Sequence, residues 1–247
     1  MDIRCAARSD DVLGETPLWC DQTDSLLWID IDRATLHRLH LASGRRDRFE
    51  FAARSLGALA LRRDAGSVVV ALEATLYTFD LGSGRLTRLA EIEPATMNTR
   101  LNDGRCDANG TLWIGTMDNG LAAPIGSFYR VDAHGMVTRQ FGDVIVSNTV
   151  ALSPDQRTLY FSDTRRFITW AFDHSPADGT LSNRRIFVDH RASRERPDGA
   201  CVDSEGALWV AIFGGGRVDR FTRDGLLDRQ RRRALGGDLR RGPGGPL

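Results

Sequence analysis

A strand motif recurs five times along this chain of 247 residues and constrains its fold more than any other feature. Each copy is a short run of apolar, β-branched or aromatic residues that follows a polar turn, as expected for a β-strand entered from a tight turn. The copies are SLLWID (25–30), SVVVAL (67–72), TLWIGT (111–116), TLYFSD (158–163) and ALWVAI (207–212). Their aligned positions Trp28, Val69, Trp113, Tyr160 and Trp209 are separated by 41, 44, 47 and 49 residues. Since β-propeller blades repeat at about 40–50 residues, the spacing predicts a propeller.

A second motif follows each copy of the first. It alternates apolar and polar residues and ends at a glycine turn, as in LYTFDLGSGR at 76–85. Each repeat is therefore predicted to contain two hairpins, or four strands. A β-sandwich with similar hairpins is the alternative, but a sandwich has no reason to repeat two motifs five times at one interval.

The end of the chain departs from the repeat. A sixth central strand would fall roughly 45–50 residues after Trp209, which is beyond the last residue, Leu247. The stretch 228–247 is rich in arginine, glycine and proline and shows no alternation, as is typical of disorder. We therefore expect a propeller domain over 1–227, a last blade without its core strands, and a disordered tail over 228–247.

The composition limits which binding partners and which cellular location we expect for this protein. The 33 basic residues balance the 33 acidic ones, so the charge favours neither nucleic acid nor an anionic membrane as a partner. The four cysteines are far apart without a CxxC spacing, and no stretch is apolar enough for a signal peptide or membrane span. The cytoplasm is the expected location, and the sequence leaves the oligomeric state open.

One register of the repeat carries oxygen-bearing side chains. Glu15 lies 13 residues before Trp28, and Asn148 lies 12 before Tyr160. The side chains in this register are Glu15, Asn102, Asn148 and Asp198, while the second repeat has Gly57 there. Because the innermost strands of a propeller surround one axis, we expect these four side chains to converge.

Two carboxylates and two amides would form an all-oxygen site. Such ligands suit hard divalent cations such as Ca²⁺, Mg²⁺ or Mn²⁺, and Zn²⁺ also accepts carboxylates. A single Asn-Asp-Gly or Pro-Asp-Gly is usually only a turn. The coincidence at one register is what indicates one divalent metal site.

Four segments also carry a family resemblance. They are LGETPLWCDQTDSLLWIDI, RLNDGRCDANGTLWIGTMD, SNTVALSPDQRTLYFSDT and RPDGACVDSEGALWVAIFGGGRV, and they occur in order between residue 12 and about residue 225. They resemble the signature segments of the regucalcin (senescence marker protein)/gluconolactonase family. The resemblance implies an all-β, six-bladed β-propeller, here with its last blade incomplete, that holds one divalent metal on its axis and hydrolyses sugar lactones.

The resemblance also implies roles for individual residues. Glu15, Asn148 and Asp198 would bind the metal, and Asp198 would also be the catalytic base. Arg100 and Asn102 would contact the substrate. Some family members have an acidic substrate contact just after the GTM segment; here that place is Gly120, with Asp118 two residues earlier as the candidate.

The predicted function is metal-dependent hydrolysis of a small-molecule sugar lactone to the aldonic acid. Two alternatives remain. One is a propeller without enzymatic activity that binds calcium or another protein. The other is an inactive, truncated family member, in which the incomplete last blade leaves the ring open.

Overall fold

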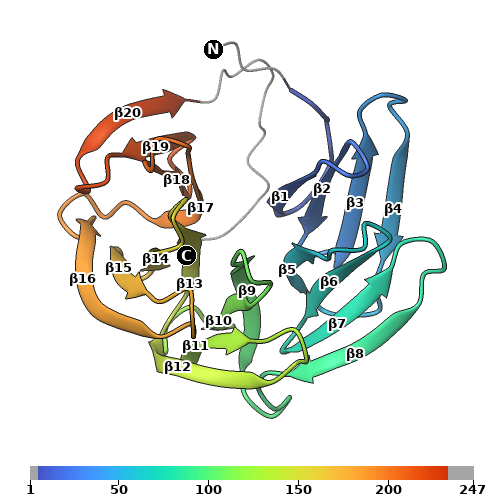
Figure 1. Cartoon of the computed structure of the whole chain (residues 1–247), viewed down its shortest axis with the longest axis horizontal. Coiled ribbons are helices and arrows are strands. Elements are labelled where there is room, and N and C mark those ends of the chain that lie inside the picture. The colour runs from blue at the N-terminus through green and yellow to red at the C-terminus, as the bar shows by residue number, and fades with distance from the viewer. Residues whose placement is uncertain (1–4, 233–247) are drawn as a thin grey trace.

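The recurring apolar runs form the second strand of five antiparallel sheets, each with four strands in sequence order (Figure 1). The computed structural model describes residues 5–232. The sheets surround a common axis as the blades of a propeller, and the first strand of each blade lies innermost. In that described part of the chain, no helix is long and apolar enough to cross a membrane.

The strands of the first three blades have the following bounds. Blade 1 contains β1 (Gly14–Cys20), β2 (Ser25–Asp30), β3 (Thr35–His40) and β4 (Arg46–Glu50). Blade 2 contains β5 (Leu56–Leu61), β6 (Ser67–Leu72), β7 (Thr75–Asp80) and β8 (Leu86–Glu91). Blade 3 contains β9 (Thr99–Cys106), β10 (Leu112–Asp118), β11 (Gly126–Val131) and β12 (Val137–Val144).

The remaining two blades follow the same plan. Blade 4 contains β13 (Ser147–Leu152), β14 (Thr158–Asp163), β15 (Ile168–His174) and β16 (Leu181–Asp189). Blade 5 contains β17 (Pro197–Val202), β18 (Leu208–Ile212), β19 (Arg217–Phe221) and β20 (Leu227–Arg232).

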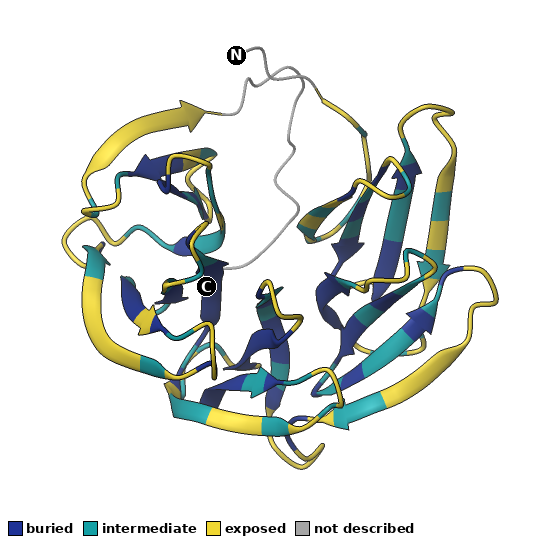
Figure 2. Ribbon diagram, viewed as in Figure 1, coloured by how far each residue is buried: buried dark blue, intermediate teal, exposed yellow. Residues whose placement is uncertain are grey.

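Four apolar cores lie between consecutive blades and hold the sheets together. Strand β10 shows how alternation serves two cores at once. Leu112 and Ile114 pack toward blade 2, whereas Trp113 packs toward blade 4. Both faces of the strand are buried, so the sequence reads as an almost continuous apolar run. The inner strands are mostly buried and the outer strands are mostly exposed (Figure 2).

The polar turns before the second strands are fixed by tryptophan. Asp107 Oδ2 accepts a hydrogen bond of 3.1 Å from Trp113 Nε1, and Asp203 Oδ2 accepts one of 2.8 Å from Trp209 Nε1. Each aspartate also accepts backbone N–H groups of its own turn through Oδ1. The turns DANG and DSEG therefore lock the register of the hairpins formed by the first and second strands of blades 3 and 5.

The prediction of six blades is wrong, because the twenty described strands form five complete four-stranded blades. Five copies of the strand motif give five sheets. Strand β20 is the fourth strand of the fifth blade, and each of its residues is exposed. A solvent-exposed outer strand needs no apolar alternation. The arginine-rich segment that forms β20 therefore shows no sequence pattern typical of a strand. The strand continues to Arg232, five residues past the predicted boundary at 227, and residues 233–247 of the predicted tail lie outside the described part.

The ring of inner strands is packed unevenly. Strands β5, β9, β13 and β17 contact one another in succession, and β1 contacts β5. Strands β17 and β1 are the least closely packed neighbours around the axis (Figure 1). The axial cavity is therefore bordered by blades 1 and 5 on its loosely packed side.

Candidate metal centre and axial cavity

A β-bulge at the same place in every inner strand delivers the residues of the predicted register. The pairing of the first two strands shifts between Glu15 and Leu18 in blade 1, and between Asn148 and Ala151 in blade 4. Corresponding shifts occur beside Gly57, at Asp103 and at Asp198. A bulge inserts one residue into a strand and re-aims the neighbouring side chains. Five such bulges turn the first strands toward one axial region.

Two of these bulges contain a threonine in the left-handed region of backbone space. Thr16 has φ of 50° and Thr149 has φ of 58°. β-Branched residues rarely adopt this conformation, and it persists only where surrounding contacts impose it. Thr149 has such a contact, because its Oγ1 donates a hydrogen bond of 2.6 Å to the backbone oxygen of Asp198. This bond ties the bulge of blade 4 to the bulge of blade 5.

The bulges surround a cavity of about 840 Å³. Predicted site residues that line it are Glu15, Arg100, Asn102, Asn148 and Asp198. Gly57, which occupies the same register in blade 2, also lines the cavity. The structure thus brings together residues that are up to 183 positions apart in the sequence, from Glu15 to Asp198.

The orientation of the Asn148 amide is fixed by Thr164. Thr164 Oγ1 donates a hydrogen bond of 2.7 Å to the backbone oxygen of Pro197, so its oxygen can only accept from Asn148. Asn148 Nδ2 donates to it at 2.8 Å. The amide nitrogen therefore points to Thr164, and the amide oxygen faces Asn102, whose Nδ2 donates to it at 3.4 Å. An amide oxygen has two lone pairs, so one remains for a metal ion.

Asn102, which contacts Asn148, has further partners. Its Nδ2 donates to the backbone oxygen of Ser147 at 2.8 Å, and its Oδ1 accepts a bond of 2.6 Å from Arg100 Nη1. The same Nη1 donates to the backbone oxygen of Leu101 at 3.0 Å. Because Asn102 Oδ1 already accepts a hydrogen bond from Arg100, this pair is better suited to contacting a substrate than to binding a metal ion.

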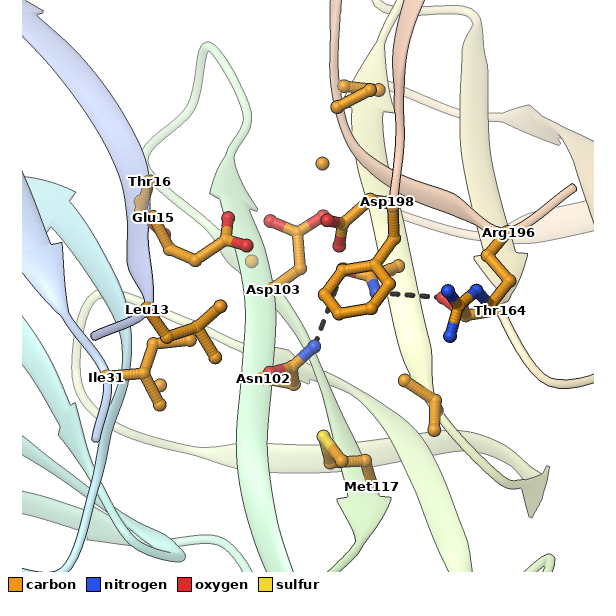
Figure 3. Close-up of a pocket in the computed structure, with 18 of the residues that line it drawn as sticks. Leu13, Glu15, Thr16, Ile31, Asn102, Asp103, Met117, Thr164, Arg196 and Asp198 are labelled. Atoms are coloured by element: carbon orange, nitrogen blue, oxygen red, sulfur yellow. Dashed lines mark hydrogen bonds between the residues drawn. The ribbon is translucent and has the colours of Figure 1, made fainter. Parts of the chain in front are cut away.

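Three carboxyl groups face one another in the cavity: those of Glu15, Asp103 and Asp198 (Figure 3). Burial, then the charges of Asp198 and Asp103, raise the pKa of Glu15 to about 8. Burial and the charge of Asp103 raise the pKa of Asp198 to about 6, against hydrogen bonds from Gly199 and Asn148. Burial also raises the pKa of Asp103, although Val150 N donates to its Oδ2 at 2.8 Å.

This donor set fits a divalent cation. A cation beside the three carboxyl groups would relieve their mutual repulsion, and Asn148, which lines the same cavity, offers an amide oxygen. Within residues 5–232, no three His, Cys, Asp or Glu side chains form a metal-binding group by themselves. A cation held by Glu15 and Asp198 would therefore need the amide oxygen of Asn148 to complete the protein's contribution, as in other oxygen-ligand sites.

Asp118 lies away from this group and does not line the cavity. Its carboxylate accepts hydrogen bonds from the backbone N–H groups of Gly120, Ala122 and Ala123, and from Asn98 Nδ2. These bonds lower its pKa, with that from Ala123 contributing most. The structure gives Asp118 the role of ordering the loop after β10, and we do not place it at a substrate.

Sequence reasoning missed several residues of the cavity, among them Asp103, Arg165 and Arg196. Asp103 follows Asn102 directly, in an Asn-Asp-Gly string that is typical of a turn. Its position in the bulged register is the signal that could have identified it. The arginines lie on loops outside the repeated strand motif, at the end of β14 and at the start of β17, so the repeat carries no signal for them.

The fold and cavity together define the class of protein: a β-propeller with an oxygen-rich site on its axis. A family model described as "SMP-30/Gluconolactonase/LRE-like region" matches residues 13–233. The chain belongs to this family, which confirms the resemblance seen in its four sequence segments.

Curated relatives agree with this assignment. The 6-deoxy-6-sulfogluconolactonase of Pseudomonas putida is 38% identical over 227 residues, covering 91% of this chain and 77% of that protein. The L-arabinolactonase of Azospirillum brasilense is 37% identical, covering 87% of this chain and 72% of that protein. The chain thus spans about three quarters of the length of these relatives.

Solved structures are similar as well. A calcium-binding protein, regucalcin, from Agrobacterium tumefaciens has a TM-score of 0.85 and 34% identity, covering 90% of this chain and 75% of that one. A gluconolactonase from Xanthomonas campestris has a TM-score of 0.72 and 26% identity, covering 88% of this chain and 75% of that one.

Proposed function

We propose that this protein hydrolyses a sugar lactone to the aldonic acid and that the reaction depends on one divalent cation. The observation that carries the proposal is the convergence of Glu15, Asn148 and Asp198 beside the Arg100–Asn102 pair in one cavity. The relatives named as lactonases, at 37% and 38% identity, support the reaction class.

The ligands of the cation would be Glu15, Asn148 and Asp198, and Ca²⁺, Mg²⁺, Mn²⁺ and Zn²⁺ all suit such ligands. When bound, the cation supplies Lewis-acid polarisation of the lactone carbonyl and lowers the pKa of water. Asp103 adds a third negative charge close to the carboxyl groups of Glu15 and Asp198, which increases the attraction for a divalent ion.

The protein's own groups would carry the remaining steps. Asp198 accepts a proton from the attacking water, whose oxygen bonds to the carbonyl carbon. The ring C–O bond then breaks, and the ring oxygen takes up the proton that Asp198 accepted, which gives the hydroxyl group of the product. Arg100, oriented by Asn102 and Leu101, donates hydrogen bonds to substrate hydroxyls or to the developing negative charge on oxygen.

A second candidate function is calcium binding without catalysis. The Agrobacterium relative is described as a calcium-binding protein, and the same oxygen ligands would serve this role. For both functions we propose the cytoplasm as the location, because all four cysteines are free thiols, as is usual in a reducing compartment.

The test is a panel of sugar lactones assayed with and without EDTA. We expect hydrolysis that EDTA abolishes, and a loss of at least about 10³-fold in Asp198→Ala, because metal ligand and base are removed together. Asp224→Ala is the matched control, since Asp224 is an exposed carboxylate in a turn of the same blade. Turnover by Asp198→Ala equal to that of the control would overturn the assignment, and Ca²⁺ binding without hydrolysis of any lactone would favour the second function.

A further inference from the structure

Two arginines that line the cavity form no ion pair with a carboxylate in the described part of the chain. Arg165 and Arg196 both line the cavity. Among residues 5–232, neither lies within ion-pair distance of an aspartate or glutamate. Arg217 and Arg220 in the same part of the molecule each contact at least two carboxylates. Arg100 and Arg105 also line the cavity without an ion pair, but their terminal nitrogens donate to Leu101 O, Asn102 Oδ1 and Ala200 O. Arg165 and Arg196 differ in that their terminal nitrogens have no hydrogen-bond partner among residues 5–232.

Arg196 is held in place by an aromatic ring. Its Cζ lies 4.6 Å from the centre of the Phe213 ring, and the backbone oxygen of Arg196 accepts a bond of 2.9 Å from Phe213 N. Stacking uses the face of the guanidinium group and leaves the N–H donors at its edge free. In the close-up, Arg196 lies on the same side of the site as Thr164, across from Glu15 (Figure 3).

Arg165 is held by a single hydrogen bond. Its Nε donates to the backbone oxygen of Leu121 at 2.8 Å, so the side chain reaches from blade 4 to the loop after β10 in blade 3. That bond uses the inner nitrogen and leaves both terminal nitrogens free to donate. Both arginines are thus oriented in advance, which reduces the entropy lost when they bind a ligand.

The cavity carries charges of both signs. Glu15, Asp103 and Asp198 form the acidic region that suits a cation, while Arg165 and Arg196 contribute positive charge from blades 4 and 5. A substrate whose lactone carbonyl lies at the acidic region would extend part of itself toward these arginines. Two guanidinium edges match the planar or tetrahedral oxygens of a carboxylate, sulfonate or phosphate.

We propose that Arg165 and Arg196 bind an anionic oxygen-bearing substituent of the substrate and thereby select charged sugar lactones over neutral ones. This inference rests on the proposed lactonase function. It names the class of substrate, a lactone with a carboxylate, sulfonate or phosphate remote from its ring ester, and it assigns the selectivity to two residues outside the metal centre.

The test compares lactones of one six-carbon aldonic acid that carry a hydroxyl, carboxylate, sulfonate or phosphate group at the carbon farthest from the ester carbonyl. The wild-type kcat/KM is expected to be at least about tenfold higher for an anionic lactone than for the neutral one. Comparison of the carboxylate, sulfonate and phosphate substrates identifies the preferred group. Arg196→Gln and Arg165→Gln should each lower this ratio by about 10- to 100-fold, the range expected for a charge-assisted hydrogen bond. Arg196→Lys should lower it less, since it keeps the charge but loses the fork of donors.

Arg191→Gln is the matched control. Arg191 lies in the loop that leads to Arg196, but it is exposed and paired with Asp189. Its removal takes away the same charge and should leave the ratio unchanged. A wild-type ratio of about one, or a ratio that neither cavity variant lowers, would overturn the inference.

A binding measurement separates this inference from the proposed function. If no lactone is hydrolysed, the proposed function fails, but calorimetric titration with the charged and neutral hydroxy acids still tests the two arginines. We expect the charged acid to bind more tightly to wild type, with a preference that falls in Arg196→Gln and Arg165→Gln. Equal binding of both acids to wild type and variants would contradict the inference.

Discussion

The side chain of Asn148 donates a hydrogen bond of 2.8 Å to Thr164 Oγ1, and this bond determines the orientation of the amide. Thr164 in turn donates to Pro197 O at 2.7 Å, one residue before Asp198. One hydroxyl group therefore links a predicted metal ligand of blade 4 to the strand that carries another in blade 5.

Replacing Thr164 by valine should weaken metal binding. The change preserves the shape of the side chain but removes both hydrogen bonds, so the Asn148 amide loses its fixed orientation. Loss of such an outer contact typically costs about 10- to 100-fold in metal affinity. Calorimetric titration of the metal-free protein measures the effect. Thr164→Ser is the control because it keeps the hydroxyl group, and equal affinities in the two variants would contradict this role.

The stability of the metal-free protein should fall as the pH rises from about 4 to about 8. Glu15 and Asp198 have folded-state pKa values of about 8 and about 6, above their ordinary values of 4.5 and 3.8. The folded state therefore binds more protons than the unfolded state between these values, and raising the pH favours unfolding. Thermal unfolding in EDTA across this range provides the measurement.

A divalent cation should reverse this trend, because it binds only the deprotonated ligands and stabilises the folded state. The increase in Tm on adding the cation is expected to be larger at pH 8 than at pH 5. Glu15→Gln should flatten the dependence in EDTA. A Tm in EDTA that stays constant or rises from pH 5 to pH 8 would show that these carboxyl groups are not buried together.

Gly57 should not tolerate alanine. A Cβ atom there would lie 1.9 Å from the backbone oxygen of Leu101, so β9 would have to move away from β5. The expected cost in stability is about 1–3 kcal/mol. The shift would also displace Arg100 and Asn102, and a displacement of about 1 Å can cost on the order of 10²-fold in rate.

Gly66→Ala serves as the control for this prediction, since a Cβ at Gly66 would meet nothing within 4 Å. Chemical denaturation and lactone assays of the two variants give the comparison. If Gly57→Ala were as stable and active as Gly66→Ala, the close approach of β5 and β9 would not be what positions Arg100.

The repeat and its register could be predicted because both depend on local sequence. Each second strand is buried on one or both faces, so its apolar residues recur visibly, and the polar turns before Trp113 and Trp209 are fixed by contacts six residues away. The convergence of the side chains from Glu15 to Asp198 follows from the symmetry of a propeller once the repeat is recognised.

The outer strand of the fifth blade and part of the site could not be predicted in this way. Strand β20 is exposed and carries no apolar pattern, so only its pairing with β19 reveals it. Asp118 is predicted to contact the substrate because it lies next to the GTM segment. In the structure its carboxylate accepts hydrogen bonds from three backbone N–H groups of its own loop. Arg165 and Arg196 reach the cavity through loops, whose course depends on tertiary contacts such as those with Leu121 and Phe213.

The central claim is that one cation held at Glu15, Asn148 and Asp198 is required for lactone hydrolysis. The most direct test titrates a divalent cation into metal-stripped protein and measures bound metal and the hydrolysis rate on the same samples. We predict a rate that rises in proportion to occupancy up to one ion per chain, and neither binding nor rate in Asp198→Ala. Full activity in the metal-stripped protein, or a rate that does not follow occupancy, would contradict the account.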